Sequence, residues 1–420
     1  MFVCAAGVIT NTQSADWPRW RGSDLTDHCL ETGLLKQWPA GGPKKLWTSR
    51  EVGLGYSSHA IAGGTLYTMG LEGDSEQIIA LDAASGKKLW ATTIGARFGN
   101  KWGDGPRATP TLEGGHVYAM GGNGDLACLD AKSGRMIWKT SMADLGGKTP
   151  GWGYCESVLV DDGKVICTPG GEMKDKIDRN RGAMAALDKR TGKLIWQSDE
   201  WKDGAQYASV VPATIHGVRQ YIQLTQANLV GISAKDGRLL WRSDWQGRTA
   251  VIPTPIVVGD EVYIASGYGV GCKKVRVGSD WSVKDVWVNK VMKNHHGGVI
   301  LHDGHLYGYS DGGGWICQSW ASGDEVWSFK AGNKDPGSFG KGAIYYANGR
   351  FILLEEQTGE VALIDASAKG WKEISRFKLD PQTEQRSKSG KIWTHPVVSG
   401  GRLYLRDQEL LHCYDVAASR

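Results

Sequence analysis

The chain has 420 residues, and its 49 basic and 45 acidic side chains give a formal net charge of +4. Charges of both signs are mixed along the sequence, so it shows no concentrated basic surface of the kind that binds nucleic acids. No apolar run approaches the roughly eighteen residues that a membrane-spanning helix needs. We therefore expect neither a nucleic-acid partner nor a transmembrane segment.

The N-terminus resembles the end of a secretory signal. Residues 2–9 are apolar, and Gln13-Ser14-Ala15 resembles the small-residue site at which such signals are cleaved. We therefore expect residues 1–15 to be the remnant of a signal peptide and the protein to be exported, to the periplasm or the extracellular space. The alternative is a disordered N-terminal tail.

From residue 80 onwards the chain repeats one phrase: a small residue, an apolar residue, Asp or Ser, Gly four positions on, and Trp four positions after that. The copies lie at Ala80-Leu81-Asp82…Gly86…Trp90, Cys128-Leu129-Asp130…Gly134…Trp138, Ala186-Leu187-Asp188…Gly192…Trp196, Gly231-Ile232-Ser233…Gly237…Trp241 and Cys317-Gln318-Ser319…Gly323…Trp327. Between the last two copies, Ser279 and Trp287 keep the spacing without the Gly. Strand-like units with a period in this range are typical of a β-propeller, with one four-stranded blade per repeat.

The residues of the phrase have separate structural roles. The Asp side chain can accept hydrogen bonds from backbone N–H groups two residues on, and Gly can adopt the left-handed conformation, so the phrase predicts a hairpin turn. The Trp ends the strand that follows the turn. A large rigid ring at the same place in each blade is expected to pack against the neighbouring blade.

A second signal counts the blades. Apolar strands of the Leu-Tyr type occur eight times, at residues 66–68, 117–119, 165–167, 220–222, 262–264, 306–308, 351–353 and 403–405. The last repeat stops at Arg420 before any Trp strand, whereas residues 44–48, with Trp47, supply such a strand at the other end of the chain. We therefore predict an all-β fold, an eight-bladed β-propeller of four-stranded antiparallel blades closed by an N-terminal strand, which removes exposed sheet edges. Residues 44–420 are expected to form this single propeller, and residues 16–43 a strap along its outside or bottom.

The repeated phrase resembles the pyrroloquinoline quinone (PQQ)-like repeat. That repeat is found in quinoprotein alcohol dehydrogenases and in the propeller lipoprotein of the outer-membrane barrel-assembly machinery. The opening Trp17-Pro18-Arg19-Trp20-Arg21-Gly22 and the phrase Asn294-His295-His296-Gly297-Gly298 are also similar to bacterial exported PQQ-like propellers. The resemblance covers nearly the whole chain and implies the fold; it does not imply one activity, because function depends on the site.

Candidate site residues come from aligning the eight repeats on the Leu-Tyr strand. Eleven positions before each Tyr the chain enters the strand that lines the axial channel, and polar residues recur at or next to this position. Convergent polar groups in a concave site are the usual mark of a binding site. The predicted ligand-binding residues are Tyr56, Arg107, Glu156, His295, His296, Lys341, Trp393 and His395. Because adjacent residues on a strand point to opposite faces, the histidines are not expected to form a metal site.

Two functions from different classes follow from these residues. The first is an exported binding or scaffold propeller that takes a carbohydrate-like or anionic small molecule at one mouth of its channel, or a protein partner at its rim. The second is a PQQ-dependent alcohol or sugar dehydrogenase, for which the resemblance implies two adjacent cysteines, a cluster of Ca²⁺ ligands and an Asp base. This chain has no adjacent cysteines, and no set of Ca²⁺ ligands stands out. The sequence therefore favours the binding protein.

Overall fold

A computed structural model describes residues 16–171, 182–330 and 338–418. The predicted signal remnant, residues 1–15, lies outside the described residues. Within the described ranges the chain is built of strands, with one short 3₁₀ turn, η1 (Ala143–Leu145). No helix of this part of the chain is long and apolar enough to cross a membrane.

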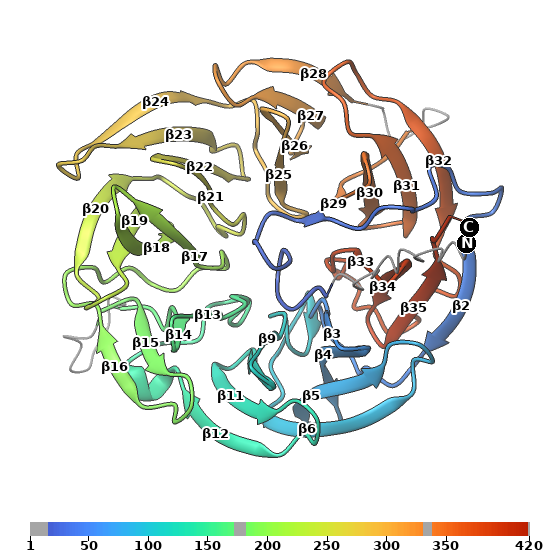
Figure 1. Cartoon of the computed structure of the whole chain (residues 1–420), viewed down its shortest axis with the longest axis horizontal. Coiled ribbons are helices and arrows are strands. Elements are labelled where there is room, and N and C mark those ends of the chain that lie inside the picture. Colours follow the sequence, from blue (N-terminus) through green and yellow to red (C-terminus); the bar gives the residue numbers. More distant parts are fainter. Residues whose placement is uncertain (1–15, 172–181, 331–337, 419–420) are drawn as a thin grey trace, which may run out of the picture.

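The strands form eight four-stranded antiparallel units arranged as a ring, which confirms the predicted eight-bladed propeller (Figure 1). Blades one to four are β3–β6 (Ala60–Ala62, Thr65–Glu72, Ser75–Asp82, Lys88–Ala96), β9–β12 (Thr111–Glu113, His116–Met120, Asp125–Asp130, Met136–Ser141), β13–β16 (Leu159–Asp161, Lys164–Cys167, Ala185–Asp188, Leu194–Gln197) and β17–β20 (Val211–Ile215, Val218–Leu224, Asn228–Ser233, Leu239–Asp244). Blades five to seven are β21–β24 (Ile256–Val258, Glu261–Ser266, Gly271–Val277, Val283–Asn289), β25–β28 (Val299–His302, His305–Ser310, Gly314–Ser319, Glu325–Phe329) and β29–β32 (Gly342–Ala347, Arg350–Glu355, Glu360–Asp365, Glu373–Lys378). A small hairpin, β7–β8 (Gly99–Asn100, Gly103–Asp104), lies between blades one and two.

The eighth blade joins the two ends of the chain. It consists of β33 (Val397–Ser399), β34 (Arg402–Asp407), β35 (Leu410–Asp415) and the N-terminal strand β2 (Lys44–Ser49), which pairs antiparallel with β35. The predicted closure is therefore confirmed.

The repeated phrase forms the hairpin turn that its sequence predicts. In the first copy the backbone N–H and the hydroxyl of Ser85 both donate to the Asp82 carboxylate, at 2.7 and 2.6 Å, and Gly86 has a φ of 72°. Asp130 and Ser133 repeat these bonds in the second copy. The turn is thus fixed by its own side chains.

The Trp of one blade packs on the Gly of the next. A Cβ atom added to Gly192 would lie 2.7 Å from the ring of Trp138, and the indole N–H of Trp138 donates to the Lys189 carbonyl at 3.0 Å. Trp90 lies in the same way against Gly134. Trp and Gly recur together because the ring of one blade lies on the bare turn of the next, a contact also made by Trp196 with Gly237 and by Trp287 with Gly323.

The closing strand reproduces this contact. A Cβ atom on Gly86 would lie 2.6 Å from the ring of Trp47, so β2 gives the eighth blade the Trp that its own repeat lacks. The fully buried Arg406 of β34 adds a second link, because its guanidinium donates to the carbonyls of Val52, Ser57 and Met69 in blade one. Blades eight and one are therefore joined by packing and by hydrogen bonds.

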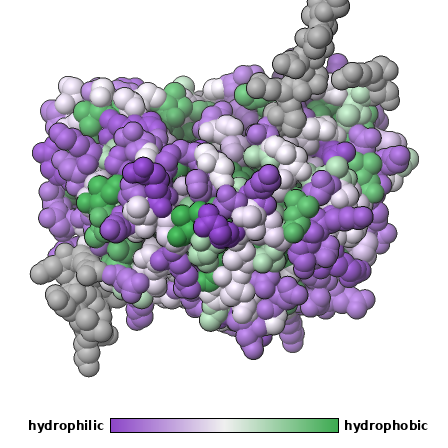
Figure 2. All heavy atoms as spheres, turned by 60° about the horizontal axis from the view of Figure 1, so that its bottom comes forward, coloured by the Kyte–Doolittle hydropathy of each residue, from purple (hydrophilic) through white to green (hydrophobic). Residues whose placement is uncertain are grey.

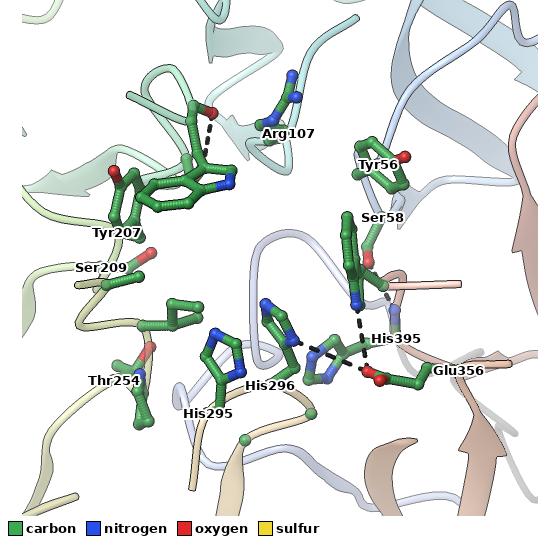
Figure 3. Close-up of a pocket in the computed structure, with 18 of the residues that line it drawn as sticks. Tyr56, Ser58, Arg107, Tyr207, Ser209, Thr254, His295, His296, Glu356 and His395 are labelled. Atoms are coloured by element: carbon green, nitrogen blue, oxygen red, sulfur yellow. Dashed lines mark hydrogen bonds and ion pairs between the residues drawn. The ribbon is translucent and has the colours of Figure 1, made fainter. Parts of the chain in front are cut away.

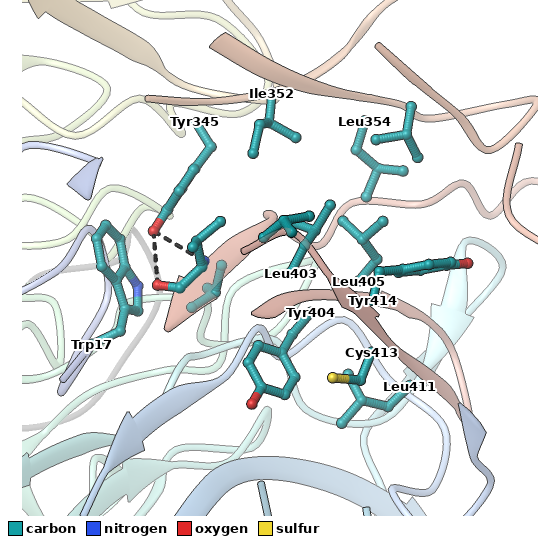
Figure 4. Close-up of a cluster of buried hydrophobic side chains, with 14 of the residues drawn as sticks. Trp17, Tyr345, Ile352, Leu354, Leu403, Tyr404, Leu405, Leu411, Cys413 and Tyr414 are labelled. Atoms are coloured by element: carbon teal, nitrogen blue, oxygen red, sulfur yellow. Dashed lines mark hydrogen bonds between the residues drawn. The ribbon is translucent and has the colours of Figure 1, made fainter. Parts of the chain in front are cut away.

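The segment of residues 16–43 crosses the ring near its axis (Figure 1). Its strand β1 (His28–Cys29) pairs parallel with β29, and Trp17 forms a bridge with Ile61 of blade one. The Trp17 ring lies 4.9 Å from that of Tyr345, in a buried cluster where this segment meets blades seven and eight (Figure 4). We call residues 16–43 the strap.

The side of the molecule shown in Figure 2 has no dominant apolar face. The side shown in Figure 2 is mainly hydrophilic, with apolar side chains in small separate groups. Scattered apolar side chains of this kind are normal on a folded protein.

Candidate functional site: an axial cavity closed by the strap

A cavity of about 360 Å³ lies on the axis of the ring. Its walls come from the segments that precede the inner strands of the eight blades, and the strap adds Trp20, Arg21 and Asp27. A volume of this size suits a small ligand. Figure 3 shows the side chains that surround the central space.

The lining residues recur in pairs two positions apart. We call the earlier members the first layer: Tyr56, Arg107, Cys155, Tyr207, Ile252, His296 and Trp393. The later members are the second layer: Ser58, Thr109, Ser157, Ser209, Thr254, Gly298 and His395. Residues two apart on an extended chain share a face, which explains why both members reach the cavity.

The structure brings seven of the eight sequence-predicted residues to the cavity wall. They are Tyr56, Arg107, His295, His296, Lys341, Trp393 and His395. Glu156 does not line the cavity. It lies between Cys155 and Ser157, which do, so its side chain points to the opposite face of the segment.

Glu156 is instead a buried structural group. It is 1 % exposed, and its carboxylate accepts hydrogen bonds from the backbone N–H of Thr168 at 2.7 Å and from the Thr168 hydroxyl at 3.1 Å. Burial raises the pKa of Glu156 from 4.5 to about 8, although these hydrogen bonds act in the other direction. The folded protein therefore holds this proton more tightly than the unfolded chain does.

This difference predicts a pH-dependent stability. The contribution of a group whose pKa is raised on folding is fully present below about pH 4.5 and is lost as pH rises through about 8. Relative to Glu156→Gln, the unfolding free energy of the wild type should fall by more than about 1 kcal/mol between pH 5 and 8, since one pKa unit corresponds to about 1.4 kcal/mol. Denaturant titrations of both proteins across this range measure the difference. Parallel curves would contradict the assignment, and other buried carboxyls cancel because both proteins contain them.

The two adjacent histidines both face the cavity, contrary to the alternation expected for a strand. The segment around them is not a strand, and their rings stack with centroids 3.8 Å apart. Burial lowers the pKa of His296 to about 3, with Lys341 adding to the effect. Burial, His296 and Lys341 hold the pKa of His295 well below its usual value, so both rings are neutral near pH 7.

Lys341 determines which nitrogen of His295 carries the hydrogen. Its ammonium donates to Asp311 at 2.7 Å and lies 3.1 Å from Nδ1 of His295. An ammonium group can only donate, so Nδ1 must accept and the neutral ring keeps its hydrogen on Nε2. His295 is thus a hydrogen-bond donor through Nε2.

A carboxylate lies beside the second histidine. The indole N–H of Trp393 donates to Oε2 of Glu356 at 3.1 Å, and Nδ1 of His296 lies 3.7 Å from the same oxygen. Burial raises the pKa of Glu356, and the nearby Lys341 opposes this effect. Figure 3 shows His296 and Glu356 on the same side of the central space.

Arg107 occupies the opposite side of the space (Figure 3). Its guanidinium donates to the carbonyls of Gly103 and Gly105 and lies 4.6 Å from the centroid of the Phe98 ring. Among the residues that the structure describes, no carboxylate forms an ion pair with it. The side chain is therefore held in place without an ion-pair partner, and it interacts electrostatically with Glu76, an acid whose pKa burial raises to about 7.

Aromatic rings complete the wall. Trp102 and Trp152 lie with centroids 5.1 Å apart, and Trp152 meets Tyr207 edge to face at 5.8 Å. On the other side Tyr56 lies 5.0 Å from Trp393. Flat apolar faces and polar groups thus alternate around the cavity.

Several lining residues were not predicted from the sequence. Among them are Ser157, Tyr207, Ser209, Glu356 and Lys391, and also Trp20 of the strap. Ser157 could have been predicted, because it lies two positions after Cys155 and therefore on the same face of the segment. In blade four, the position eleven residues before Tyr221 is Val210, which is buried. The residue that lines the cavity is Tyr207, fourteen positions before Tyr221. The inner strand of that blade is longer, five residues against three in blades one, two, three, five and eight.

The donor set does not fit the calcium-bound quinone that the family resemblance implies. In the described part of the chain, no group of three or more His, Cys, Asp or Glu side chains is placed to hold a metal ion. The chain also has no adjacent cysteines. Among the described residues, the carboxylates on the wall are Asp27, which pairs with Arg21 at 2.7 Å, and Glu356.

The two cysteines near the cavity are free thiols. Cys155 lines the wall, and Cys167 lies buried in β14; the two are not joined by a disulfide. Burial raises the pKa of Cys155 to about 12 and that of Cys167 well above its usual value. Neither thiol is a ready nucleophile near neutral pH.

Comparisons with known proteins agree with this architecture. BamB from Moraxella catarrhalis is 13 % identical, with a TM-score of 0.59 over 89 % of this chain and 99 % of that one. The computationally designed Ika8 protein is 10 % identical, with a TM-score of 0.57 over 89 % of this chain and all of that one. A europium-containing methanol dehydrogenase is 12 % identical, with a TM-score of 0.50 over 94 % of this chain and 89 % of that one. At such low identity these similarities show the fold alone.

The sequence itself gives a family match. No curated protein is significantly similar to the chain. A family model described as outer membrane protein assembly factor BamB matches residues 36–119 and, in a second match, residues 74–329. The two matches together span more than half of the chain, and the chain therefore belongs to this family of PQQ-like β-propellers.

Proposed function

We propose that the protein is an exported binding propeller whose axial cavity takes a small sugar acid or a related organic acid. The observation that carries this proposal is Arg107, a fixed cation on the cavity wall without a carboxylate partner in the described chain. Arginine in this state is suited to bind a carboxylate with two hydrogen bonds.

The other charges of the wall support an anionic ligand. Two of the cations, Arg21 and Lys341, are paired with Asp27 and Asp311. Lys391 resembles Arg107, because the partner of its ammonium is the neutral side chain of Gln357, at 3.1 Å. The wall therefore carries an excess of positive charge, which favours an acid over a neutral molecule.

The aromatic rings support a ligand with flat apolar faces. The Trp102, Trp152 and Tyr207 rings present such faces beside the polar groups, and the C–H groups of a sugar-acid chain can pack on them. Pockets that combine aromatic walls with a few fixed polar groups are typical of small-molecule sites. Export is supported by the apolar N-terminal residues and by membership of the BamB family. A protein partner at the rim stays a prediction.

Calorimetric titration of the full chain tests the proposal. D-gluconate and D-glucitol share one six-carbon chain and differ in a single carboxylate, so the account predicts that gluconate binds and that glucitol binds at least about tenfold more weakly. Arg107→Met should weaken gluconate binding by a similar factor.

Arg97→Met is the matched control. Arg97 pairs with Asp104 on the neighbouring hairpin and does not line the cavity, so its removal should leave gluconate binding unchanged. Equal affinities for gluconate and glucitol, or no effect of Arg107→Met, would contradict the proposed function.

A further inference from the structure

The second layer of the cavity contains a set of hydroxyl groups with one feature in common. Each of four hydroxyl oxygens accepts a hydrogen bond from an N–H group of another blade or of the strap. The bonds are His395 N–H to Ser58 at 2.8 Å, Thr109 N–H to Ser157 at 2.9 Å, Ser157 N–H to Ser209 at 3.0 Å and the Trp20 indole N–H to Thr254 at 3.2 Å. We call Ser58, Ser157, Ser209 and Thr254 the hydroxyl belt.

The hydrogens of the belt are uncommitted. A hydroxyl that accepts an N–H still has its own O–H to donate, and within the described ranges none of the four donates to a protein group. All four side chains belong to residues that are at most 9 % exposed, and all line the cavity. Buried donors are normally satisfied, so four such hydrogens around one small space require an acceptor there.

A buried histidine in the same layer is a further polar group without its full set of partners. His395 is 7 % exposed and lines the cavity, and its buried Nδ1 has no hydrogen-bond partner among the described residues. Its ring packs edge to face on Trp20 of the strap at 4.5 Å, which fixes its position on the cavity wall. Burial lowers the pKa of His395 to about 3, so the ring is neutral and still carries one N–H.

The layer therefore offers several O–H donors to the same space. Each belt hydroxyl accepts one N–H and keeps its own hydrogen to donate, together with one free lone pair. A carboxylate forms short, strong bonds with O–H donors, and the excess of positive charge on the wall favours such an acid over a neutral polyol. Figure 3 shows Ser58, Ser209 and Thr254 around the same central space as Arg107.

We propose that the hydroxyl belt is a second carboxylate subsite, so that the cavity takes a small dicarboxylic acid, with one acid group on Arg107 and the other in the belt. The proposal rests on the proposed function and extends it. Arg107 lies two residues before Thr109. The N–H of Thr109 donates to Ser157 and the N–H of Ser157 donates to Ser209, so two hydrogen bonds connect the segment of Arg107 to the belt. Trp20 of the strap donates a hydrogen bond to Thr254 and packs on His395, so the strap contacts the belt directly.

The test uses a third ligand of the same chain length. D-glucarate has a carboxylate at both ends, so the wild type should bind it at least about tenfold more tightly than D-gluconate in calorimetric titration, the effect of one charge-assisted bond or more. The double variant Ser157→Ala/Ser209→Ala should lose this preference, measured as the ratio of the two affinities, so that any weakening common to both ligands cancels. Arg107→Met should weaken both ligands.

Ser198→Ala is the matched control. Ser198 is 2 % exposed and its hydroxyl also accepts a backbone N–H, that of Met184 at 3.1 Å, but it does not line the cavity. This variant loses a comparable buried hydrogen bond and should keep the preference for glucarate. Melting temperatures confirm that each variant is folded.

The outcomes separate the two proposals. Equal binding of glucarate and gluconate by the wild type, or an unchanged preference in the double variant, would overturn the belt and leave the proposed function standing. Failure of both acids to bind, or equal binding of gluconate and glucitol, would overturn the proposed function and the belt with it.

Discussion

A protein that lacks residues 44–50 should not reach a soluble folded state. These residues contain β2, which forms the outer strand of the eighth blade and covers the edge of β35. Without it, a row of unpaired backbone groups would be exposed, and the bare turn at Gly86 would lose the ring of Trp47. We expect aggregation on expression, measured as loss of the monomer peak in size-exclusion chromatography.

Leu46→Ala is the control for this deletion. The Leu46 side chain is 36 % exposed and lies at the bulge of β2, so its removal leaves the backbone pairing intact. The variant should elute and melt as the wild type does. A soluble deletion protein with an unchanged melting transition would show that the ring does not depend on this strand.

Trp138→Ala should lower the unfolding free energy by about 3–5 kcal/mol, the usual range for removing a large buried aromatic side chain. Trp138 is 8 % exposed, covers Gly192 of the next blade and donates to the Lys189 carbonyl. Its loss leaves a cavity between two blades and removes one of the two hydrogen bonds that the Lys189 carbonyl accepts, the other coming from the Tyr118 hydroxyl. Denaturant titration measures the change.

Leu194→Ala provides the comparison for Trp138→Ala. Leu194 is 48 % exposed on the outer strand of the same neighbouring blade, so its truncation should cost less than about 0.5 kcal/mol, as is usual on a surface. A loss below about 1 kcal/mol for Trp138→Ala, well under the usual range, would mean that the ring does not hold the blades together.

The fold was predictable because its signals are local and repeated. The Asp82–Gly86 turn and the Trp90 strand recur with one spacing. The last repeat stops at Arg420 without a Trp strand, and this gap identified Trp47 as the Trp of the eighth blade. Each of these residues acts within its own hairpin or on the adjacent turn. A short motif therefore contains most of the information needed for the ring.

The site was harder to predict because successive side chains of an extended segment point to opposite faces. An error of one position selected Glu156 in place of Ser157, and the longer inner strand of blade four moved the register from Val210 to Tyr207. Alternation failed in the opposite sense at His295 and His296, since that segment is not a strand. Small changes in local geometry decide which side chain faces the axis.

The path of the strap across the ring was not predicted; the sequence indicated only a segment along the outside or bottom of the propeller. Its path across the ring depends on contacts distant along the chain, such as the bond from Trp20 to Thr254 and that from Arg21 to the Val299 carbonyl, 3.0 Å long. No periodic signal encodes such contacts. The strap nevertheless closes the cavity and forms part of its wall, so one element without a repeat decides the shape of the site.

The most direct test of the binding account is a crystal structure of the full chain grown with D-glucarate. The account predicts electron density for one molecule in the axial cavity, with a carboxylate at hydrogen-bond distance from the Arg107 guanidinium. Density for the acid only on the outer surface, with the cavity filled by water alone, would contradict it.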